Sequence, residues 1–461
     1  MAFKEYKGLD LVATGNEVLD RWKKNHAFEK SLELREGAPE FIFFEGPPSA
    51  NGMPGIHHVM ARSIKDAICR YKTQSGYKVN RRAGWDTHGL PVELGVEKML
   101  GITKEDIGTK ISVEEYNDAC RKEVMKYTAE WVNMTERVGY WVDMDDPYIT
   151  YDNRYIETLW FLLKKIYDKG LLYKGKSIQP YSPAAGTGLS THELNQPGCY
   201  RDVKDTTATA QFKVVRDEKS EFLFAEGVQP YFLAWTTTPW TLPSNTALCV
   251  GPNIDYVRVL STNPYTGVPG LYIVAQALVG AHFNPKKQEF TVLEGTLKGS
   301  ELTGIRYEQL IPWFNPGEGA FKVIPGDYVT TEDGTGIVHI APTFGADDAK
   351  VARLAGVPGL QVVDRNGDLQ AQVDLRGRFF RIEDLDPEYA AANMSPAYAE
   401  WEGRYVKNAY DASLPADAPT LDVDICVMLK QENKAFKIEK HTHNYPHCWR
   451  TDKPVLYYPL N

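Results

Sequence analysis

The stretch F-I-F-F-E-G-P-P-S-A-N-G-M-P-G-I-H-H-V-M-A-R, from Phe41 to Arg62, decides the fold of this chain. Phe41 to Phe44 is a short apolar run that stops at Gly46-Pro47-Pro48, which predicts a buried strand of a parallel sheet followed by a turn. From His57 onward, apolar residues recur at helical spacing. The order of strand, tight loop and helix predicts an α/β fold in which the start of the helix meets a phosphate group.

Two histidines, His57 and His58, stand at the predicted start of that helix. Imidazole groups at this place can contact a triphosphate, because charge spreads over the phosphate oxygens as phosphorus is attacked and positioned donors stabilise it. Taken alone, paired histidines at a helix start more commonly cap the helix or face solvent. The residues that follow favour the binding role.

A second motif, G-W-D-T-H-G-L-P-V-E, begins at Gly84. Together with G-P-P-x-A-N-G it resembles the class I aminoacyl-tRNA synthetases and, within them, the isoleucyl branch, since valyl and leucyl enzymes carry other residues at the second motif. The resemblance implies the first half of a Rossmann-type nucleotide-binding fold that uses ATP with Mg²⁺ to activate isoleucine and transfers it to tRNA(Ile). The residues implied to bind the amino acid are Gly46, Pro47, Gly84, Trp85, Asp86 and His88, with Asp86 pairing with its ammonium. Those implied at ATP are Pro48, Asn51, Gly55, His57 and His58, the two histidines being catalytic.

The chain departs from the family at one place. The family signature His-x-Gly-His is replaced by Gly55-Ile56-His57-His58. We interpret this as an exchange within one helical turn, in which His58 keeps its place and His57 supplies the imidazole lost at Gly55. Histidine where glycine is usual crowds the backbone against which adenosine would lie. We therefore expect adenylate analogues to bind differently here.

From about Cys199 to Leu414, short apolar runs are separated by Gly, Pro, Asn and Asp, which predicts a β-rich, barrel-like domain inserted into the nucleotide-binding fold. Two stretches stand out, L-A-W-T-T-T-P-W-T-L-P-S-N at 233–245 and G-T-G-I-V-H-I-A-P-T-F-G-A-D-D at 334–348. A threonine run alone is typical of a sheet edge. The two stretches together resemble the editing domain of isoleucyl, valyl and leucyl synthetases.

That resemblance implies one pocket that admits valine, excludes isoleucine and pairs Asp348 with the substrate ammonium. The residues implied to line it are Thr236, Thr237, Thr238, Thr241, Asn245, His339 and Asp348. Asp347 is predicted to be a helix N-cap. No activated nucleophile is evident, so we expect an oriented water to attack the aminoacyl ester. A second sieve is needed because one methylene is worth only ~1–3 kcal/mol in an apolar pocket, a limit for which isoleucyl-tRNA synthetase is the usual example.

Relatives often bind zinc at a knuckle made from two cysteine pairs. At the corresponding positions this chain has Ser182 and Ala185, then Cys448 and Thr451. One thiolate among four positions does not make a structural zinc site. We therefore predict no zinc at this knuckle.

Length and composition set the remaining expectations. With 461 residues, the chain is too long for one core, and we predict residues 1–198 as an N-terminal extension and first Rossmann half, 199–414 as the inserted editing domain and 415–461 as the return toward the catalytic domain. The second Rossmann half and an anticodon-binding domain are not expected within it. Six scattered cysteines fit a reducing cytoplasm, and no membrane segment or signal peptide is indicated. We expect a monomer.

A net charge of -9 argues against indiscriminate binding of nucleic acid, so any contact with tRNA must be local. The best basic patch consists of Lys434, Lys437, Lys440 and Arg450, although a solvated face explains these residues nearly as well. Two other functions stay open. One is a freestanding deacylase of mischarged tRNA that uses the nucleotide-binding half as a scaffold, and the other is a noncatalytic tRNA-binding paralogue.

Overall fold

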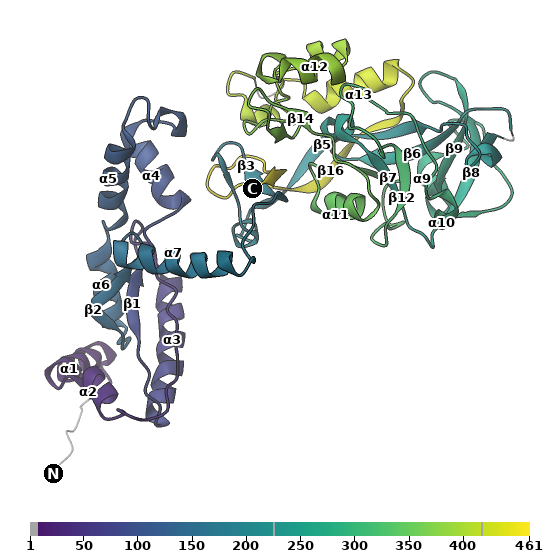
Figure 1. The fold of residues 1–461 in the computed structure, drawn as a ribbon. Helices are drawn as coiled ribbons and strands as arrows, with labels where there is room; N and C mark the ends of the chain where they lie inside the picture. The colour runs from purple at the N-terminus through teal and green to yellow at the C-terminus, as the bar shows by residue number, and fades with distance from the viewer. Residues whose placement is uncertain (1–7, 225, 416–417) are drawn as a thin grey trace. The chain divides into compact units, whose positions relative to one another are not determined.

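The computed structural model describes residues 8–224, 226–415 and 418–461. The chain forms two compact units, one extending to residue 173 and the other running from residue 174 to residue 461. Figure 1 shows the helices and strands of each unit. Among the helices of the described ranges, none combines the length and apolar character needed to cross a membrane.

The first unit is built on a strand, helix, strand arrangement. Its two strands, β1 (Arg82–Trp85) and β2 (Asp143–Ile149), pair in parallel and are joined through helices, as parallel neighbours require. The helix α3 (Ile56–Gln74) precedes β1. The predicted α/β class is therefore confirmed. The other helices are α1 (Leu11–Lys24), α2 (Ala27–Glu33), α4 (Leu90–Leu100), η1 (Lys104–Asp106), α5 (Val113–Val124), α6 (Thr128–Arg137) and α7 (Asn153–Asp168).

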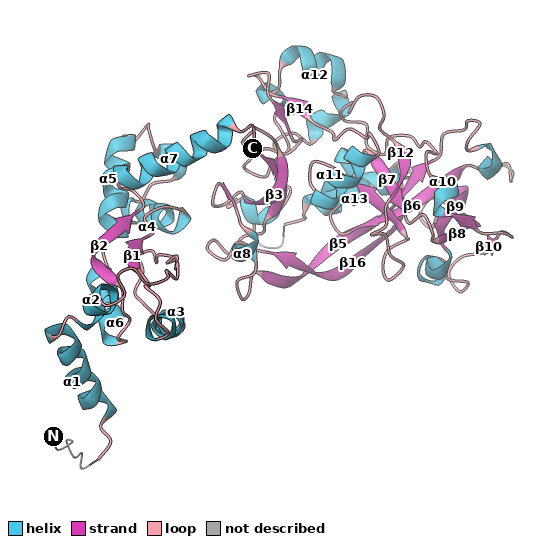
Figure 2. Ribbon diagram, turned by 60° about the horizontal axis from the view of Figure 1, so that its bottom comes forward, coloured by secondary structure: helices cyan, strands magenta, loops and turns pink. Residues whose placement is uncertain are grey.

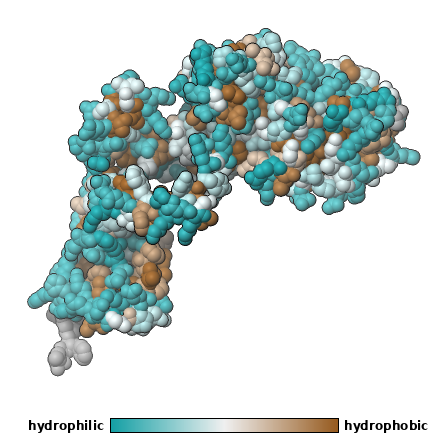
Figure 3. All heavy atoms as spheres, in the orientation of Figure 1, coloured by the Kyte–Doolittle hydropathy of each residue, from teal (hydrophilic) through white to brown (hydrophobic). Residues whose placement is uncertain are grey.

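The strand predicted at Phe41 to Phe44 is not formed, so this prediction is wrong. At the start of the segment, Glu40 forms a single bridge to Lys78 and the Phe41 backbone N–H donates to the Lys78 carbonyl over 2.9 Å, and the next bridge, from Ser49 to Asp86, lies beyond the segment. Ile42 is 71% exposed and Phe44 is 89% exposed. The apolar run predicted burial on both faces of a sheet. Because the side chains of Ile42 and Phe44 are exposed, burial of apolar surface does not stabilise a strand here. Apolar residues lie at the surface of this unit as brown patches in Figure 3.

The second unit is organised by a mixed sheet of ten strands. Seven strands run in the order β10-β8-β9-β6-β13-β7-β12, while β11 pairs with β8, β5 with β6 and β16 with β5. The predicted β-rich domain is confirmed. The strands are β5 (Tyr200–Lys213), β6 (Pro230–Thr236), β7 (Ala247–Val250), β8 (Asp255–Thr262), β9 (Pro269–Ala275), β10 (Phe290–Val292), β11 (Leu297–Lys298), β12 (Lys322–Pro325), β13 (Ile337–Ile340) and β16 (Ala435–Pro446).

Short helices and small sheets surround this main sheet. A three-stranded sheet has the order β17 (Leu456–Leu460), β3 (Ser177–Ser182), β4 (Thr187–Gly188), and β14 (Val362–Val363) pairs with β15 (Leu369–Gln370). The helices are α8 (Thr191–Leu194), η2 (Glu221–Phe224), η3 (Pro239–Ser244), η4 (Gln276–Leu278), α9 (Val279–His282), α10 (Gly299–Leu302), α11 (Ala346–Leu354), η5 (Ile382–Asp384), α12 (Pro387–Asn393), η6 (Pro396–Glu400), η7 (Asn408–Tyr410) and α13 (Leu421–Gln431).

The longest pairing in this unit joins β5 and β16, which lie side by side in Figure 2. The antiparallel register runs from Tyr200 opposite Pro446 to Ala210 opposite Ala435. Much of the predicted return segment, 415–461, is thus part of the sheet. Residues 174–198 also lie in the second unit, whereas the sequence placed a domain boundary at 198/199. The boundary at 198/199 between the first Rossmann half and the inserted editing domain stays a prediction.

A buried cluster of charges links the helix α13 to η3. Lys407 Nζ lies 3.0 Å from a carboxylate oxygen of Asp205 and 3.7 Å from one of Asp422. Asp422 accepts a hydrogen bond of 2.9 Å from the backbone N–H of Trp240, inside the first turn of η3. Burial raises the pKa of Asp422 to about 6, and the Lys407 ammonium opposes that rise. The cluster therefore fixes the start of η3 from the outside of the sheet.

We predict that Lys407→Met destabilises the second unit by about 3–5 kcal/mol, because the buried Asp422 and the partly buried Asp205 lose the Lys407 ammonium. Lys434→Met is the matched control, since Lys434 pairs with Glu432 at the surface and such pairs contribute at most about 1 kcal/mol. Urea unfolding of both variants beside the parent chain measures the difference. Equal losses for the two variants would show that the buried cluster is no more important than a surface pair.

Candidate functional site

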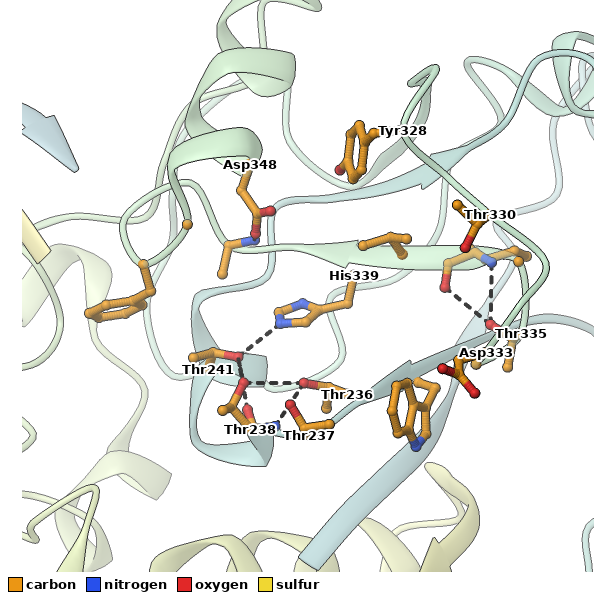
Figure 4. A pocket seen from close by; sticks show the side chains of 18 residues that line it. Thr236, Thr237, Thr238, Thr241, Tyr328, Thr330, Asp333, Thr335, His339 and Asp348 are labelled. Carbon is orange, nitrogen blue, oxygen red and sulfur yellow. Dashed lines mark hydrogen bonds between the residues drawn. The ribbon is translucent and has the colours of Figure 1, made fainter. Parts of the chain in front are cut away.

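One cavity of the second unit brings the two predicted motifs together (Figure 4). It has a volume of about 420 Å³. Its lining is Trp235, Thr236, Thr237, Thr238, Thr241, Tyr328, Thr330, Asp333, Gly334, Thr335, Gly336, Ile337, Val338, His339, Ala341, Phe344, Gly345 and Asp348. All predicted editing residues except Asn245 line this cavity, and Asn245 lies directly behind it, against His339.

Strand pairing explains why the motifs meet. The strand β13 runs parallel to β6, with Val338 opposite Trp235, so the start of the threonine run at Thr236 lies beside His339. After β6 the chain turns into η3, whose Pro239 stands at the first helical position, as proline favours. Thr238 is the residue before this helix and Thr241 lies within it. The threonine hydroxyls therefore gather on one wall of the cavity.

These hydroxyls contact one another. Thr238 Oγ1 lies 3.3 Å from the hydroxyl oxygens of both Thr236 and Thr241. The Thr241 hydroxyl also lies 2.8 Å from the backbone oxygen of Thr238, to which it donates. Because the hydroxyls bond within the wall, the threonine methyl groups limit the size of what the wall accepts.

His339 is a buried histidine held at both ring nitrogens. Its Nε2 lies 2.9 Å from Thr241 Oγ1, and its Nδ1 lies 3.1 Å from Asn245 Nδ2. Burial lowers the pKa of His339 to about 4, since the charged imidazolium is poorly solvated there. His339 is therefore a neutral group at physiological pH, and it acts through hydrogen bonds rather than through charge.

Asp348 lies on the opposite wall, in the first turn of α11, with its side chain pointing into the cavity (Figure 4). Its Oδ2 accepts a hydrogen bond of 2.8 Å from the backbone N–H of Ala341. Burial raises the pKa of Asp348 to about 6, and the neighbouring Asp347 adds to the rise. No salt bridge within the described ranges neutralises Asp348. A cationic group of a ligand would fill that role.

The helix cap predicted at Asp347 is wrong. Gly345 is the N-cap of α11, and Asp347 lies two residues later in the first turn, exposed to solvent. The two adjacent acidic residues differ in exposure, since Asp347 is exposed and Asp348 lines the cavity. Asp347 is thus a matched control for Asp348.

The chemistry available in the cavity is limited by its residues. Its lining contains no cysteine and no serine, so threonine hydroxyls are the only alcohols there. The single histidine has both ring nitrogens committed to protein groups. This arrangement suits hydrolysis by a positioned water more than attack by an activated side chain.

Sequence reasoning missed several residues of the site. Tyr328, Thr330 and Asp333 line the cavity from the loop that precedes Gly334, just outside the quoted motif. Trp235 and Thr335 lie inside the two quoted stretches but were not singled out. Their closeness to the motifs was the signal available in the sequence.

In the first unit, the residues predicted to bind the amino acid gather at the end of β1. The backbone N–H of Asp86 donates to the Pro48 carbonyl over 3.0 Å, and its Oδ1 accepts from the backbone N–H of His88 over 3.3 Å. His88 Nδ1 lies 2.9 Å from Thr150 Oγ1. Within the described ranges, Asp86 has no salt bridge. It is a carboxylate that a substrate ammonium can approach.

The neighbours of Asp86 have structural roles as well. Trp85 is buried against Ala50 and Trp131, and a Cβ at Gly84 would lie 2.4 Å from the Tyr148 ring. The loop from Gly46 through Pro47 and Asn51 to Gly52 is held at its end, where Trp131 Nε1 donates to the Gly52 carbonyl over 2.8 Å. The loop, Asp86 and the start of α3 thus share one support, Trp131.

The two histidines at the start of α3 have different environments. His58 Nδ1 accepts a hydrogen bond of 2.9 Å from the Gly55 backbone N–H, so His58 caps the helix, and its ring packs against Trp131. Burial lowers the pKa of His58, with further lowering from His57 and Arg62. His57 is exposed and folds over Gly55, where a Cβ would lie 2.9 Å from its ring. Glycine at position 55 thus makes room for the histidine at position 57.

The knuckle predicted to lack zinc is packed with apolar side chains. Cys448 is buried beside Leu189, Leu194 and Val455. Ser182 is also buried, and its hydroxyl accepts from the Ala185 backbone N–H over 3.2 Å. With Ala185 and Thr451 at the other two positions, this donor set does not fit structural zinc. Within the described ranges, no group of three or more His, Cys, Asp or Glu could hold a metal ion.

The predicted basic patch is partly neutralised. Lys434 pairs with Glu432 and Lys437 pairs with Glu439. Lys440 Nζ contacts Thr206 Oγ1 at 2.6 Å, and the Arg450 guanidinium lies 3.8 Å above the Trp449 ring. A role for the patch in binding tRNA stays a prediction.

Comparison with known proteins places these features in a family. The model of the tRNA synthetases of class I (I, L, M and V) matches residues 17–333. The chain therefore belongs to the class I tRNA synthetase family.

Among curated relatives, the isoleucine–tRNA ligases of Bacteroides fragilis, Porphyromonas gingivalis and Cytophaga hutchinsonii are 65%, 63% and 55% identical to this chain, each match covering 100% of it. The matches cover 41%, 41% and 42% of those proteins, so the chain spans about two fifths of the length of these relatives. A solved structure, the cytosolic leucyl-tRNA synthetase editing domain of P. knowlesi, is 11% identical, with a TM-score of 0.33, over 51% of this chain and 97% of that one.

We predict that Asp348→Asn changes the pH dependence of stability. The raised pKa means that protonated Asp348 stabilises the fold fully below the unfolded-state value of 3.8, and that this stability is lost as the pH rises through about 6. The free energy of unfolding of the parent chain, relative to the variant, should therefore fall by about 1–3 kcal/mol between pH 4 and pH 7. Urea unfolding across that range measures it, with Asp347→Asn as a control expected to give a much smaller change. A pH-independent difference for Asp348→Asn would contradict the burial of this carboxyl.

Proposed function

We propose that this chain is the N-terminal part of an isoleucine–tRNA ligase and that its second unit hydrolyses valyl-tRNA(Ile). The observation that carries this proposal is the cavity in which the threonine wall, neutral His339 and the unpaired Asp348 carboxylate face one another. The names and high identities of the relatives supply the amino acid and the tRNA.

In the proposed reaction, ionised Asp348 binds the free ammonium of the aminoacyl group. The amino-acid side chain then lies toward the methyl groups of the threonine wall, where a side chain larger than that of valine meets steric resistance. The ester lies near Thr241, whose hydroxyl oxygen accepts a hydrogen bond from the attacking water, while His339 holds Thr241 in position. The neighbouring ribose hydroxyl of the tRNA relays the proton to the leaving oxygen.

The first unit is proposed to provide half of the adenylation site. Asp86 would bind the ammonium of isoleucine, and His57 and His58 would meet ATP at the start of α3, where unpaired backbone N–H groups also favour phosphate. Magnesium would accompany ATP and neutralise its phosphates. Aminoacylation itself requires the remaining length found in the relatives. We propose that the protein acts as a monomer in the cytoplasm.

The proposal is tested by hydrolysis of valyl-tRNA(Ile) and isoleucyl-tRNA(Ile) by this chain. We expect selective release of valine, and we expect Asp348→Ala to lower that rate by about 10²-fold, because a buried charge pair with the substrate ammonium is lost. Asp347→Ala should keep the rate of the parent chain, since its carboxylate faces solvent.

Equal hydrolysis of both substrates would rule out the size selection assigned to the threonine wall. Loss of activity in both aspartate variants would point to a general effect of charge on tRNA binding. If the chain releases neither amino acid, the assay is repeated on a chain extended to the length of the relatives, and inactivity there as well would refute the editing assignment.

We also predict a pH dependence for this hydrolysis. Binding of the substrate ammonium requires ionised Asp348, whose pKa lies at about 6, so kcat/KM should fall about tenfold per pH unit below that value. Steady-state rates between pH 4.5 and pH 8 measure the profile. An Asp348→Asn variant should have low activity and no such inflection, and an inflection that persists in this variant would assign the titration to another group.

A further inference from the structure

Tyr307 lies behind the wall of the cavity and outside both motifs. Its ring is 2% exposed and packs edge-on against Phe212 and Phe321, with ring centres 5.4 Å and 6.0 Å apart. Its backbone N–H donates to the Phe321 carbonyl over 3.0 Å. Burial holds the pKa of Tyr307 well above its usual value, so the hydroxyl keeps its proton. Tyr307 is therefore a rigid hydrogen-bond donor.

The Tyr307 hydroxyl donates to Asn245 Oδ1 over 2.7 Å. On the other side of the amide, Asn245 Nδ2 donates to the Ala247 carbonyl over 2.8 Å and lies 3.1 Å from His339 Nδ1. Turning the amide over would set Oδ1 against the Ala247 carbonyl oxygen, which repels it. Tyr307 and Ala247 thus hold the amide from its two ends, and Nδ2 must face His339.

This orientation determines which nitrogen of His339 carries the proton. Asn245 Nδ2 can only donate, so His339 Nδ1 must accept, and the neutral ring carries its hydrogen on Nε2. Nε2–H then donates to Thr241 Oγ1 over 2.9 Å. With its own proton directed to the Thr238 carbonyl, Thr241 has one acceptor lone pair left, which the Thr238 hydroxyl at 3.3 Å or a group in the cavity can use. Such an acceptor can hold a water by one of its hydrogens.

We propose that Tyr307 is a positioning residue of the hydrolytic site, which fixes the Asn245 amide and so holds His339 in the Nε2–H tautomer that sets the hydrogen bonding of Thr241. The proposal rests on the proposed editing function for its link to catalysis. In the other tautomer, Thr241 would donate to His339 Nε2 and release the Thr238 carbonyl. The threonine wall would then change its hydrogen bonding without any change in its shape.

The test compares the 461-residue chain with its Tyr307→Phe variant, which removes one oxygen from a ring that stays packed. Histidine ¹⁵N chemical shifts distinguish the two tautomers, and the spectrum of His339→Gln assigns the signal. We expect an Nε2–H signal in the parent chain and a loss of that single tautomer in Tyr307→Phe. Tyr398→Phe is the matched control, because the equally buried Tyr398 hydroxyl donates to a backbone carbonyl, that of Phe380.

Hydrolysis of valyl-tRNA(Ile) supplies the second readout. For Tyr307→Phe we expect kcat to fall about tenfold with KM within about twofold, since the substrate contacts remain while the buried Asn245 oxygen loses its partner. An unchanged tautomer in Tyr307→Phe, or an Nδ1–H tautomer in the parent chain, would overturn the proposal. So would an unchanged kcat.

The two readouts keep this proposal separate from the proposed function. If the parent chain has no hydrolytic activity, the editing function fails for this chain, while the ¹⁵N signal still decides whether Tyr307 controls His339. If Tyr307→Phe does not fold, the tautomer of His339 in the parent chain decides whether the proposal stands. A similar loss of kcat in Tyr398→Phe would reduce the effect to general destabilisation and would count against the proposal.

Discussion

Hydrogen bonds between buried polar groups behind the threonine wall hold the cavity in shape. From one side, Asp422 accepts the backbone N–H of Trp240 and is itself paired with Lys407. From the other, His339 and Asn245 bond to each other. A shift of either side alone would leave a buried polar group without a hydrogen-bond partner. Such a group costs about as much free energy as several favourable contacts contribute, so the two sides keep their places together. The wall is therefore placed by His339, which contacts Thr241 directly, and by Asn245, Asp422 and Lys407, which do not line the cavity.

Burial has opposite effects on the two titratable groups of the cavity. It lowers the pKa of His339 and raises that of Asp348, because in each case the charged form is disfavoured. At neutral pH the result is a neutral histidine beside an ionised carboxylate. A ligand that brings a positive charge removes the remaining electrostatic penalty, whereas an anionic ligand would add to it. The same physical cause thus produces both a hydrogen-bonding wall and a charge-selective wall.

The sequence predicted the parts of the site that depend on local motifs, and it failed where distant contacts decide. Thr241, His339 and Asp348 lie in recognisable stretches, and the resemblance to the editing domain implied that these stretches line one pocket. The sequence of Phe41 to Phe44 is typical of a buried strand, but burial depends on what packs against the segment. Among the described residues, nothing buries Ile42 or Phe44, and both are exposed to solvent. Tyr307 carried no signal at all, because a single tyrosine gains its role only from a partner 62 positions earlier in the chain.

The pairing of β5 with β16 places the first and last strands of the large sheet in neighbouring positions, with Tyr200 opposite Pro446. A segment of more than two hundred residues therefore begins and ends at nearly the same point in space. A host fold needs only a small gap between two of its residues to accept such a segment, and its own core need not be repacked. In evolutionary terms, a domain of this shape can be gained, replaced or lost as one unit, because the stem that joins it to the rest of the chain is a pair of hydrogen-bonded strands.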